Sequence, residues 1–185
     1  MRTEIRAAPL LIRPFTAADI EAVYEAVRES ITELSYWLAW CHPEYSKDET
    51  TAHILASREA WAEGVEFNFG IFDEATTRFI GSTGLNQINR QYRMANLGYW
   101  VRTSATGQGI ASTAARLVAE FGLKELSLQR IEIVVGVENQ ASQRTAEKAG
   151  ARRECILRKR LRTKGQPIDA VMYSLIAEDF DERKS

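Results

Sequence analysis

The sequence predicts an α/β (α+β) domain built on a mixed, mostly antiparallel sheet with helices packed against it. Apolar residues recur at the helical period over much of residues 16–63, which predicts helices there. The pattern changes to strand-like alternation across residues 66–101. A strand, helix, strand, helix order follows over residues 95–148, which indicates a parallel crossover within the sheet.

Length and composition bound the class of protein. The chain has 185 residues, enough for one well-packed domain and too few for two ordinary ones, so we expect a single domain over residues 1–185. Hydrophobic residues make up 45% and charged residues 26%, as in soluble globular domains. The net charge of -1 argues against a general affinity for nucleic acid or for an anionic membrane.

The cysteines, the histidines and the N-terminus exclude further classes. Two cysteines and two histidines are too few for a disulfide framework or a structural zinc site, and we expect no metal. The N-terminus carries charges where a signal peptide needs an apolar stretch, and no apolar run approaches the ~18 residues that span a bilayer. We therefore expect a cytoplasmic protein without a membrane partner. A homodimer is compatible with the sequence, which does not fix the oligomeric state.

Three helices are expected before residue 65. The first begins after Pro14, where Thr16 and Asp19 form a pair like a capping box. The second continues through residues 31–40 and ends in an aromatic cluster. The third spans about residues 48–63 and is closed by a glycine.

Strands follow. Residues 66–71 and 79–88 form the two arms of a predicted hairpin, and residues 95–101 return beside it as a third antiparallel strand. A glycine-bearing loop then leads into an amphipathic helix that ends near residue 124. The remaining predicted elements are a strand over residues 131–137, a helix over about 139–148, and two strands over 153–162 and 168–176.

The loop at residues 106–112 has the properties of a phosphate-binding turn. A helix start offers unpaired backbone N–H groups, and the glycines there remove side chains that would block close approach. An ordinary helix-start turn explains the same residues. A Rossmann motif does not fit, because Ser112 stands at the third glycine position, and a Walker loop lacks its Gly-Lys-Ser/Thr.

With its flanks, this segment resembles the phosphate loop of the GNAT superfamily of acyl-CoA-dependent N-acetyltransferases. The family pattern Gln/Arg-x-x-Gly-x-Gly/Ala matches Thr106-Gly107-Gln108-Gly109-Ile110-Ala111 except at its first position, and Leu97-Gly98-Tyr99-Trp100-Val101 is similar to the strand before it. The resemblance covers about residues 10–178. It implies a sheet of about seven strands, splayed at its centre, with helices on both faces.

The resemblance also implies a cosubstrate and the residues that hold it. Loop amides would bind the pyrophosphate of acetyl-CoA, and the strand end near Val101 would pair with pantetheine. The implied cofactor-binding residues are Val101, Gly107, Gln108, Gly109, Ile110, Ala111, Ser112 and Asn139.

A second motif points to the RimJ/RimL-like branch, which acetylates the N-termini of ribosomal proteins. The pattern of that branch, N-x-x-S-x-x-x-x-E-K-x-G, is similar to Val137-Glu138-Asn139-Gln140-Ala141-Ser142 followed by Glu147-Lys148-Ala149-Gly150. By this similarity Asn139 contacts pantetheine, and Ser142 is the catalytic residue that hydrogen-bonds or protonates the departing thiolate. An ordinary N-cap for Asn139 and a solvent-facing Ser142 are the alternatives.

The general base is not evident. Asn96 stands where related sequences often have Glu, and Leu161 falls at a second position that is acidic in some relatives. Glu33, Glu44 and Glu66 are unplaced candidates. A site without a strong base suits an α-amine of pKa ~7.7 better than a lysine amine of pKa ~10.4.

The acceptor side is predicted from an aromatic cluster and two asparagines. Trp37 and Trp40 resemble the acceptor-side helix of the same branch, although core packing explains aromatic residues at this spacing equally well. With Asn86 and Asn96 they form the expected substrate site. Residues 152–164 hold seven basic side chains against Glu154 alone, which indicates either a solvated strand or attraction of an acidic partner.

The sequence therefore predicts transfer of an acetyl group from acetyl-CoA to a primary amine, by direct attack in a ternary complex. The favoured acceptor is a protein N-terminal α-amine. A small-molecule amine is the alternative acceptor, and a non-catalytic acyl-CoA-binding module is the alternative class. Nucleic acid is not an expected partner except as part of a ribosomal target.

Overall fold

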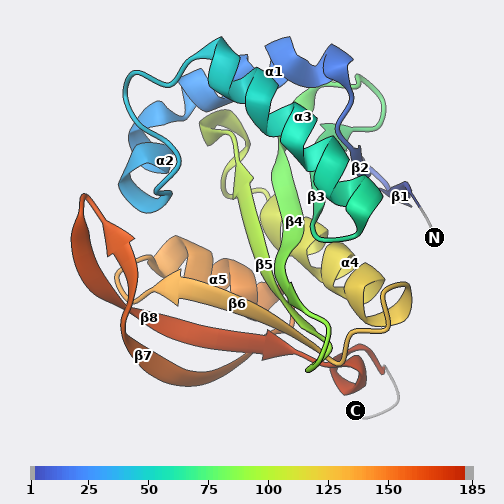
Figure 1. The fold of residues 1–185 in the computed structure, drawn as a ribbon, viewed down its shortest axis with the longest axis vertical. Coiled ribbons are helices and arrows are strands. Elements are labelled where there is room, and N and C mark those ends of the chain that lie inside the picture. Colours follow the sequence, from blue (N-terminus) through green and yellow to red (C-terminus); the bar gives the residue numbers. More distant parts are fainter. Residues whose placement is uncertain (1–2, 182–185) are drawn as a thin grey trace.

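The structure, a computed structural model, describes residues 3–181. Its centre is a sheet of eight strands in the order β1-β2-β3-β4-β5-β6-β8-β7 (Figure 1). Every neighbouring pair is antiparallel except β5 with β6, which confirms the predicted mixed sheet. The strands are β1 (Ile5–Ala7), β2 (Leu10–Pro14), β3 (Phe67–Asp73), β4 (Phe79–Asn89), β5 (Met94–Val101), β6 (Arg130–Gly136), β7 (Arg152–Thr163) and β8 (Gln166–Leu175).

Helices cover both faces of the sheet. The α-helices are α1 (Ile20–Glu29), α2 (Ile31–Trp37), α3 (Lys47–Glu63), α4 (Ile110–Lys124) and α5 (Gln140–Lys148), with 3-10 turns at Ala17–Asp19, Thr103–Ala105 and Ala177–Phe180. Helices α4 and α5 lie behind the sheet, α1 and α3 lie in front of its N-terminal half, and α2 lies at the left, above the β7–β8 hairpin (Figure 1). Each layer has its own apolar core, because the sheet presents buried side chains to both faces.

The sheet divides at its centre, as the splayed arrangement predicts. β5 and β6 pair only from Met94–Arg130 to Asn96–Glu132. Beyond these pairs β5 continues beside β4 to Val101, and β6 continues beside β8 to Gly136. The two halves of the sheet therefore separate, and the space between their ends holds the candidate active site.

Two differences from the predicted elements lie near the N-terminus. The sheet has eight strands, in keeping with the about seven expected, and the pair β1 and β2, which the residue pattern did not place, puts Ile5, Leu10 and Ile12 in the core. The second helix stops at Trp37, so Trp40 lies in the loop that follows and not on the helix. No helix within the described residues is long and apolar enough to cross a membrane.

Candidate active site

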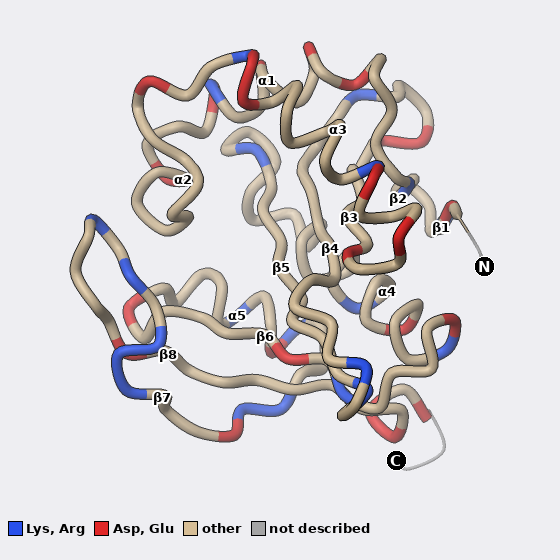
Figure 2. Tube along the Cα trace, in the orientation of Figure 1, with Lys and Arg blue, Asp and Glu red and all other residues tan. Residues whose placement is uncertain are grey.

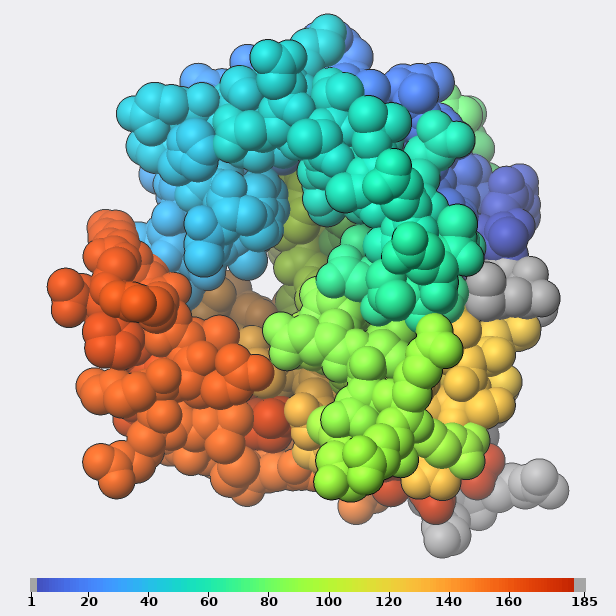
Figure 3. All heavy atoms as spheres, in the orientation of Figure 1, coloured from blue at the N-terminus to red at the C-terminus, as the bar shows by residue number. Residues whose placement is uncertain are grey.

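A cavity of about 520 Å³ occupies the gap where β5 and β6 part. One wall is the free end of β5, from Leu97 to Val101, and the opposite wall is the end of β6, from Ile133 to Gly136. The glycine loop, α5, α2 and the β7–β8 hairpin complete the lining. Figure 3 shows the hollow on the front face where α2, the β4–β5 hairpin and β7 come together.

The loop at the start of α4 has the geometry of an anion-binding turn. Gly107 and Gly109 have φ of 76° and 77°, a left-handed conformation that favours glycine. The first helical bond runs from the Thr113 N–H to the Gly109 carbonyl at 3.0 Å, which leaves the amides of Ile110, Ala111 and Ser112 without a helical acceptor. These three residues line the cavity, so their amides are available to a ligand there.

The junction between α1 and α2 holds this loop in place. Ser30, which is 1% exposed, accepts a hydrogen bond from the Thr103 N–H at 2.9 Å through its hydroxyl oxygen. Glu29 accepts one from the Ser104 N–H at 3.0 Å and another from Arg102 Nε at 2.9 Å. The Arg102 guanidinium lowers the pKa of Glu29 to about 2. The segment that enters the glycine loop is therefore fixed by an ionised carboxylate.

Ser142 lies in the cavity at the first turn of α5. Asn139 is the N-cap of this helix, and its side-chain oxygen accepts a hydrogen bond from the Ser142 N–H at 3.0 Å. Both residues line the cavity. Asn139 is therefore an N-cap, which was the predicted alternative to a cofactor-binding role. It also lines the cavity in which pantetheine is expected to bind.

Tyr99 is a candidate functional residue that the sequence analysis did not single out. Its hydroxyl lies 2.9 Å from the Ser142 carbonyl oxygen and 3.0 Å from Ser142 Oγ. Burial raises the pKa of Tyr99 to about 12, so the phenol keeps its proton at neutral pH. When that proton is donated to Ser142 Oγ, the serine hydroxyl can direct its own proton into the cavity.

Two cationic residues of α5 were also not among the predicted site residues. Arg144 and Lys148 line the cavity, as do Ser142 and the glycine loop. Ser142, Thr145 and Lys148 follow each other at intervals of three residues and share one helix face. This spacing from Ser142 is the signal that could have identified Lys148, since a cosubstrate with phosphates needs cations near the loop amides.

Not every predicted cofactor-binding or acceptor-side residue reaches the cavity. Val101, Gly107, Gly109 and Trp37 line it. The Gln108 side chain instead donates to the Ser104 carbonyl, and Gln108 faces a separate hollow beside the N-terminal hairpin.

Asn86 and Asn96 are not among the residues that line the cavity. Each is the partner of the other across β4 and β5, and the Asn96 side-chain amide donates to Asn86 Oδ1 at 2.9 Å. The two predicted acceptor-site asparagines are therefore joined by one hydrogen bond and do not line the cavity.

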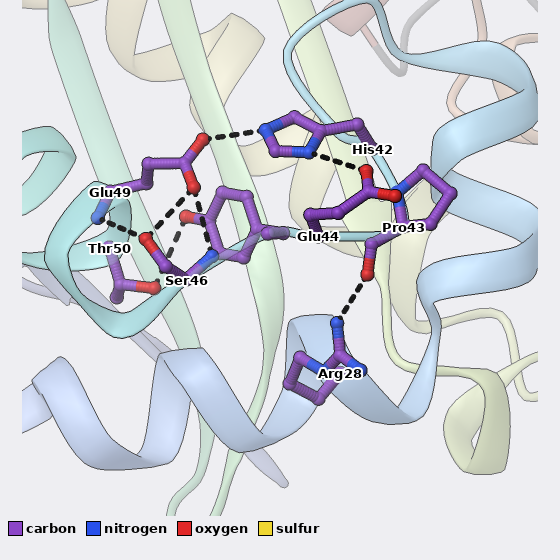
Figure 4. Close-up of polar contacts among 8 residues, drawn as sticks. Arg28, His42, Pro43, Glu44, Ser46, Glu49 and Thr50 are labelled. Atoms are coloured by element: carbon purple, nitrogen blue, oxygen red, sulfur yellow. Dashed lines mark hydrogen bonds and ion pairs between the residues drawn. The ribbon is translucent and has the colours of Figure 1, made fainter.

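The loop that carries Trp40 is fixed between α2 and α3. His42 Nε2 lies 2.7 Å from Glu49 Oε1, and Arg28 donates to the Pro43 carbonyl at 2.7 Å (Figure 4). Glu49 raises the pKa of His42 by accepting its hydrogen bond. Trp40 itself is 45% exposed and does not line the cavity. Its ring centroid is 6.3 Å from that of Trp100, which does.

One carboxylate, Glu33, is present among the described residues that line the cavity. Its Oε2 accepts from Thr103 Oγ1 at 3.2 Å, which ties it to the segment before the glycine loop. Leu161 lines the cavity as an apolar residue. Glu44 and Glu66 lie elsewhere, against His42 and Asn68 respectively.

Comparisons with known proteins agree with this geometry. Residues 9–152 match the family model described as an acetyltransferase (GNAT) domain. YjcK of Bacillus subtilis, whose name marks it as an N-acetyltransferase, is 33% identical over 139 residues, covering 75% of this chain and 77% of YjcK. The ribosomal-protein-serine acetyltransferase of Escherichia coli is 27% identical over 131 residues, covering 71% of this chain and 72% of that protein.

Solved structures share the fold. RimL, described as a ribosomal L7/L12 alpha-N-protein acetyltransferase and solved with coenzyme A, superposes with a TM-score of 0.87 at 24% identity, over 94% of this chain and 97% of that one. The divided sheet, the glycine loop at a helix start and the cavity between them fit an acyl-CoA-dependent acyltransferase, the class that the family match shows. The chain belongs to the GNAT acetyltransferase family, whose members transfer an acetyl group from acetyl-CoA to an amine.

Proposed function

We propose that this enzyme acetylates the N-terminal α-amine of a protein, with Ser142 assisting the departure of CoA. The observation that carries the proposal is the cavity, which joins the glycine loop and Ser142 to the mouth between α2 and the β7–β8 hairpin. The similarity to the Escherichia coli ribosomal-protein-serine acetyltransferase supports a protein acceptor.

In this proposal the chain's residues position two substrates and assist one bond exchange. The amides of Ile110, Ala111 and Ser112 hold the pyrophosphate, with Arg144 and Lys148 beside it. The amine nitrogen attacks the thioester carbonyl, the nitrogen–carbon bond forms and the carbon–sulfur bond breaks. Ser142 donates a hydrogen bond to the departing sulfur. Water removes the proton that nitrogen loses, and an equivalent proton ends on sulfur to give the thiol.

The acceptor class follows from the ionisable groups around the cavity. The Glu33 carboxylate accepts a hydrogen bond from Thr103, and no other carboxylate is present among the described residues that line the cavity. An α-amine is about one-sixth neutral at pH 7, whereas a lysine amine is neutral in about one molecule in 2,500. That difference is worth ~3.7 kcal/mol of deprotonation. A site of this composition therefore favours the α-amine, of which a much larger fraction is already neutral at pH 7.

The test uses three matched peptides: one with a free N-terminus and no lysine, one with a blocked N-terminus and one lysine, and one with neither amine. Release of the CoA thiol is measured for each. We expect release with the free N-terminus and none above background with the other two. Preference for the lysine peptide would contradict the proposed acceptor, and turnover of small amines alone would favour the small-molecule alternative.

A Ser142→Ala variant separates catalysis from binding. We expect it to lower kcat at least tenfold while leaving the affinity for CoA near normal, because the backbone amides that hold the pyrophosphate are unaffected. An unchanged kcat would remove Ser142 from the reaction. If the wild-type protein binds acetyl-CoA and releases no thiol with any amine, it is a binding module.

A further inference from the structure

The β7–β8 hairpin forms an arm that carries an unusual concentration of positive charge. Residues 158–164 contain five basic side chains and no acidic one. They lie along the second half of β7, which is the edge strand of the sheet, and in the turn to β8 (Figure 2). Among the described residues, no ion pair engages any of these five cations. The arm therefore presents charge that the chain itself does not neutralise.

A bulge concentrates three of these cations at one place, which we call the cationic bulge: Arg158, Lys159 and Arg160. Leu157 pairs with Ala170 and Leu161 with Ile168, so the three residues between them face Asp169 alone on β8. Lys159 has φ of 53°, and its N–H donates to Asp169 Oδ1 at 2.8 Å. All three side chains are exposed. Bulges re-aim side chains and interrupt pairing, and here three consecutive exposed cations share one short stretch of backbone.

The cationic bulge lies beside the acceptor mouth of the cavity. Leu161 and Arg162, the next residues along β7, line the cavity. Thr163 donates to the Tyr36 carbonyl, and the Lys164 ammonium lies 4.5 Å from the centre of the Tyr36 ring. These contacts join the arm to α2 across the mouth. An extended acceptor peptide with its first residue in the cavity, leaving it past Leu161 and Arg162, would therefore carry its following residues past the bulge.

Two other roles for the bulge fit the structure poorly. Arg158, Lys159 and Arg160 do not line the cavity, whereas Arg144 and Lys148 do and stand near the glycine loop. The bulge is therefore not placed to hold the phosphates of CoA. Pairing of β7 with a second copy of itself would bring like charges into opposition, which is unfavourable.

We infer that the cationic bulge binds acidic residues that follow the acceptor's N-terminus, so that this enzyme prefers acceptor proteins with an acidic segment a few residues behind the acetylated amine. This inference rests on the proposed function, since it concerns the same acceptor. Exposed charges attract over about one Debye length, ~10 Å at 0.1 M salt, and the preference is thus a salt-sensitive gain in acceptor capture.

The test compares peptides of about ten residues that share their first four residues and carry Glu, Gln or Lys at positions five to eight. Thiol release gives kcat/KM for each. We expect the Glu peptide to exceed the Gln peptide by roughly tenfold at low ionic strength, with the Lys peptide below both and the differences shrinking at about 0.5 M salt. The advantage should appear in KM, with kcat alike for the Glu and Gln peptides.

Two variants identify the surface. Arg158→Gln/Lys159→Gln/Arg160→Gln should bring the Glu peptide to the rate of the Gln peptide while leaving the Gln peptide's kcat/KM unchanged. Lys47→Gln/Arg58→Gln/Lys124→Gln removes the same charge from α3 and α4 and should keep the preference. Loss of the preference in both variants would mean that overall charge, and not the bulge, attracts the acceptor.

The other possible results of these measurements also support or contradict the inference. Equal kcat/KM for the Glu and Gln peptides with wild-type protein overturns it and leaves the proposed function intact. If no peptide of any charge is acetylated, the proposed acceptor is wrong and the inference falls with it. If a single-stranded RNA of about twenty nucleotides binds the wild-type protein and not the bulge variant, and the peptides show no preference, the bulge is an RNA-binding surface.

Discussion

Tyr99 and Ser142 share a hydrogen-bond arrangement that determines which proton faces the cavity. Tyr99 has one proton and two acceptors within 3.0 Å, the carbonyl and the hydroxyl of Ser142. In one arrangement Ser142 donates to Tyr99 and has no proton for sulfur. In the other Tyr99 donates to Ser142 Oγ, and the serine proton is free for the departing thiolate. Under the proposed function, Tyr99 is thus a positioning residue that acts through Ser142.

We expect Tyr99→Phe to lower kcat about tenfold with little change in KM for acetyl-CoA. The loss follows because the phenol no longer supports the productive orientation of the serine hydroxyl. In a Ser142→Ala background the same substitution should cost nothing further, since the two residues act as one unit. Steady-state kinetics of the four proteins measure this cycle.

Tyr173→Phe is the matched control for this cycle. Tyr173 is also buried, and its hydroxyl donates to Glu147 at 3.2 Å, but it does not line the cavity. Its removal should affect stability and leave kcat unchanged. Additive losses in the Tyr99 and Ser142 double variant would show that Tyr99 acts independently of Ser142.

At the scale of an element, the glycine loop depends on a backbone conformation that other residues adopt at a cost. Gly109 is the N-cap of α4 at φ of 77°, and Gly165 in the β7–β8 turn has φ of 75°. Alanine at either position has open space around its Cβ and costs roughly 1 kcal/mol of backbone strain. We expect Gly109→Ala and Gly165→Ala to lower the unfolding midpoint similarly, but only Gly109→Ala to raise KM for acetyl-CoA. Equal effects on KM would refute a specific role for the loop.

Glu29, at the junction of α1 and α2, should make the stability of the fold depend on pH in the acid range. The folded-state pKa of Glu29 is about 2, below its ordinary value, so its charge stabilises the fold at pH above ~4.3 and this contribution is lost as the pH falls toward about 2. We expect Glu29→Gln to make acid unfolding shallower across that window and to raise KM for acetyl-CoA several-fold at pH 7. The control is Glu25→Gln, one turn earlier on the exposed side of α1. An identical acid profile in wild type and Glu29→Gln would exclude this role.

The elements that the sequence predicted share strong local signals. The capping-box pair at Thr16 and the closing Gly64 mark helix ends, and the motifs at residues 106–111 and 139–142 place the loop and Ser142. The errors come where local signals are weak or where long-range packing decides. β1 has three residues, and β1 and β2 gain stability only by pairing along the sheet. Helix α2 ends early because Leu38 adopts an extended conformation.

The parts of the site that the sequence missed join residues far apart in the chain. Tyr99 and Ser142 are separated by 43 positions and meet only because β5 and α5 flank the same gap. Asn86 and Asn96 bond to each other because of the β4–β5 register, which contains an irregularity just beyond Asn86. Register and crossover geometry are properties of the assembled sheet, and residue spacing alone does not encode them.

At the scale of the whole molecule, the two halves of the sheet meet through only three residue pairs between β5 and β6. A ligand that fills the gap and contacts both halves should stabilise the fold as a unit. At a CoA concentration 100-fold above Kd the gain is about 2.7 kcal/mol, which raises the unfolding midpoint of a protein of this size by roughly 5–11 °C.

Thermal unfolding with and without CoA measures this shift, and adenosine 3′,5′-bisphosphate, which lacks pantetheine, should give a smaller one. No shift with saturating CoA, together with no heat in a calorimetric titration, would contradict the assignment of the cavity to the cosubstrate.

The bond from Thr163 to the Tyr36 carbonyl ties α2 to the β7–β8 hairpin, and both elements line the cavity. If the acceptor is a protein N-terminus, as proposed, it would reach the cavity past two elements that are held together. Loss of this bond in a Thr163→Val variant would then loosen the entrance and leave the glycine loop and Ser142 in place.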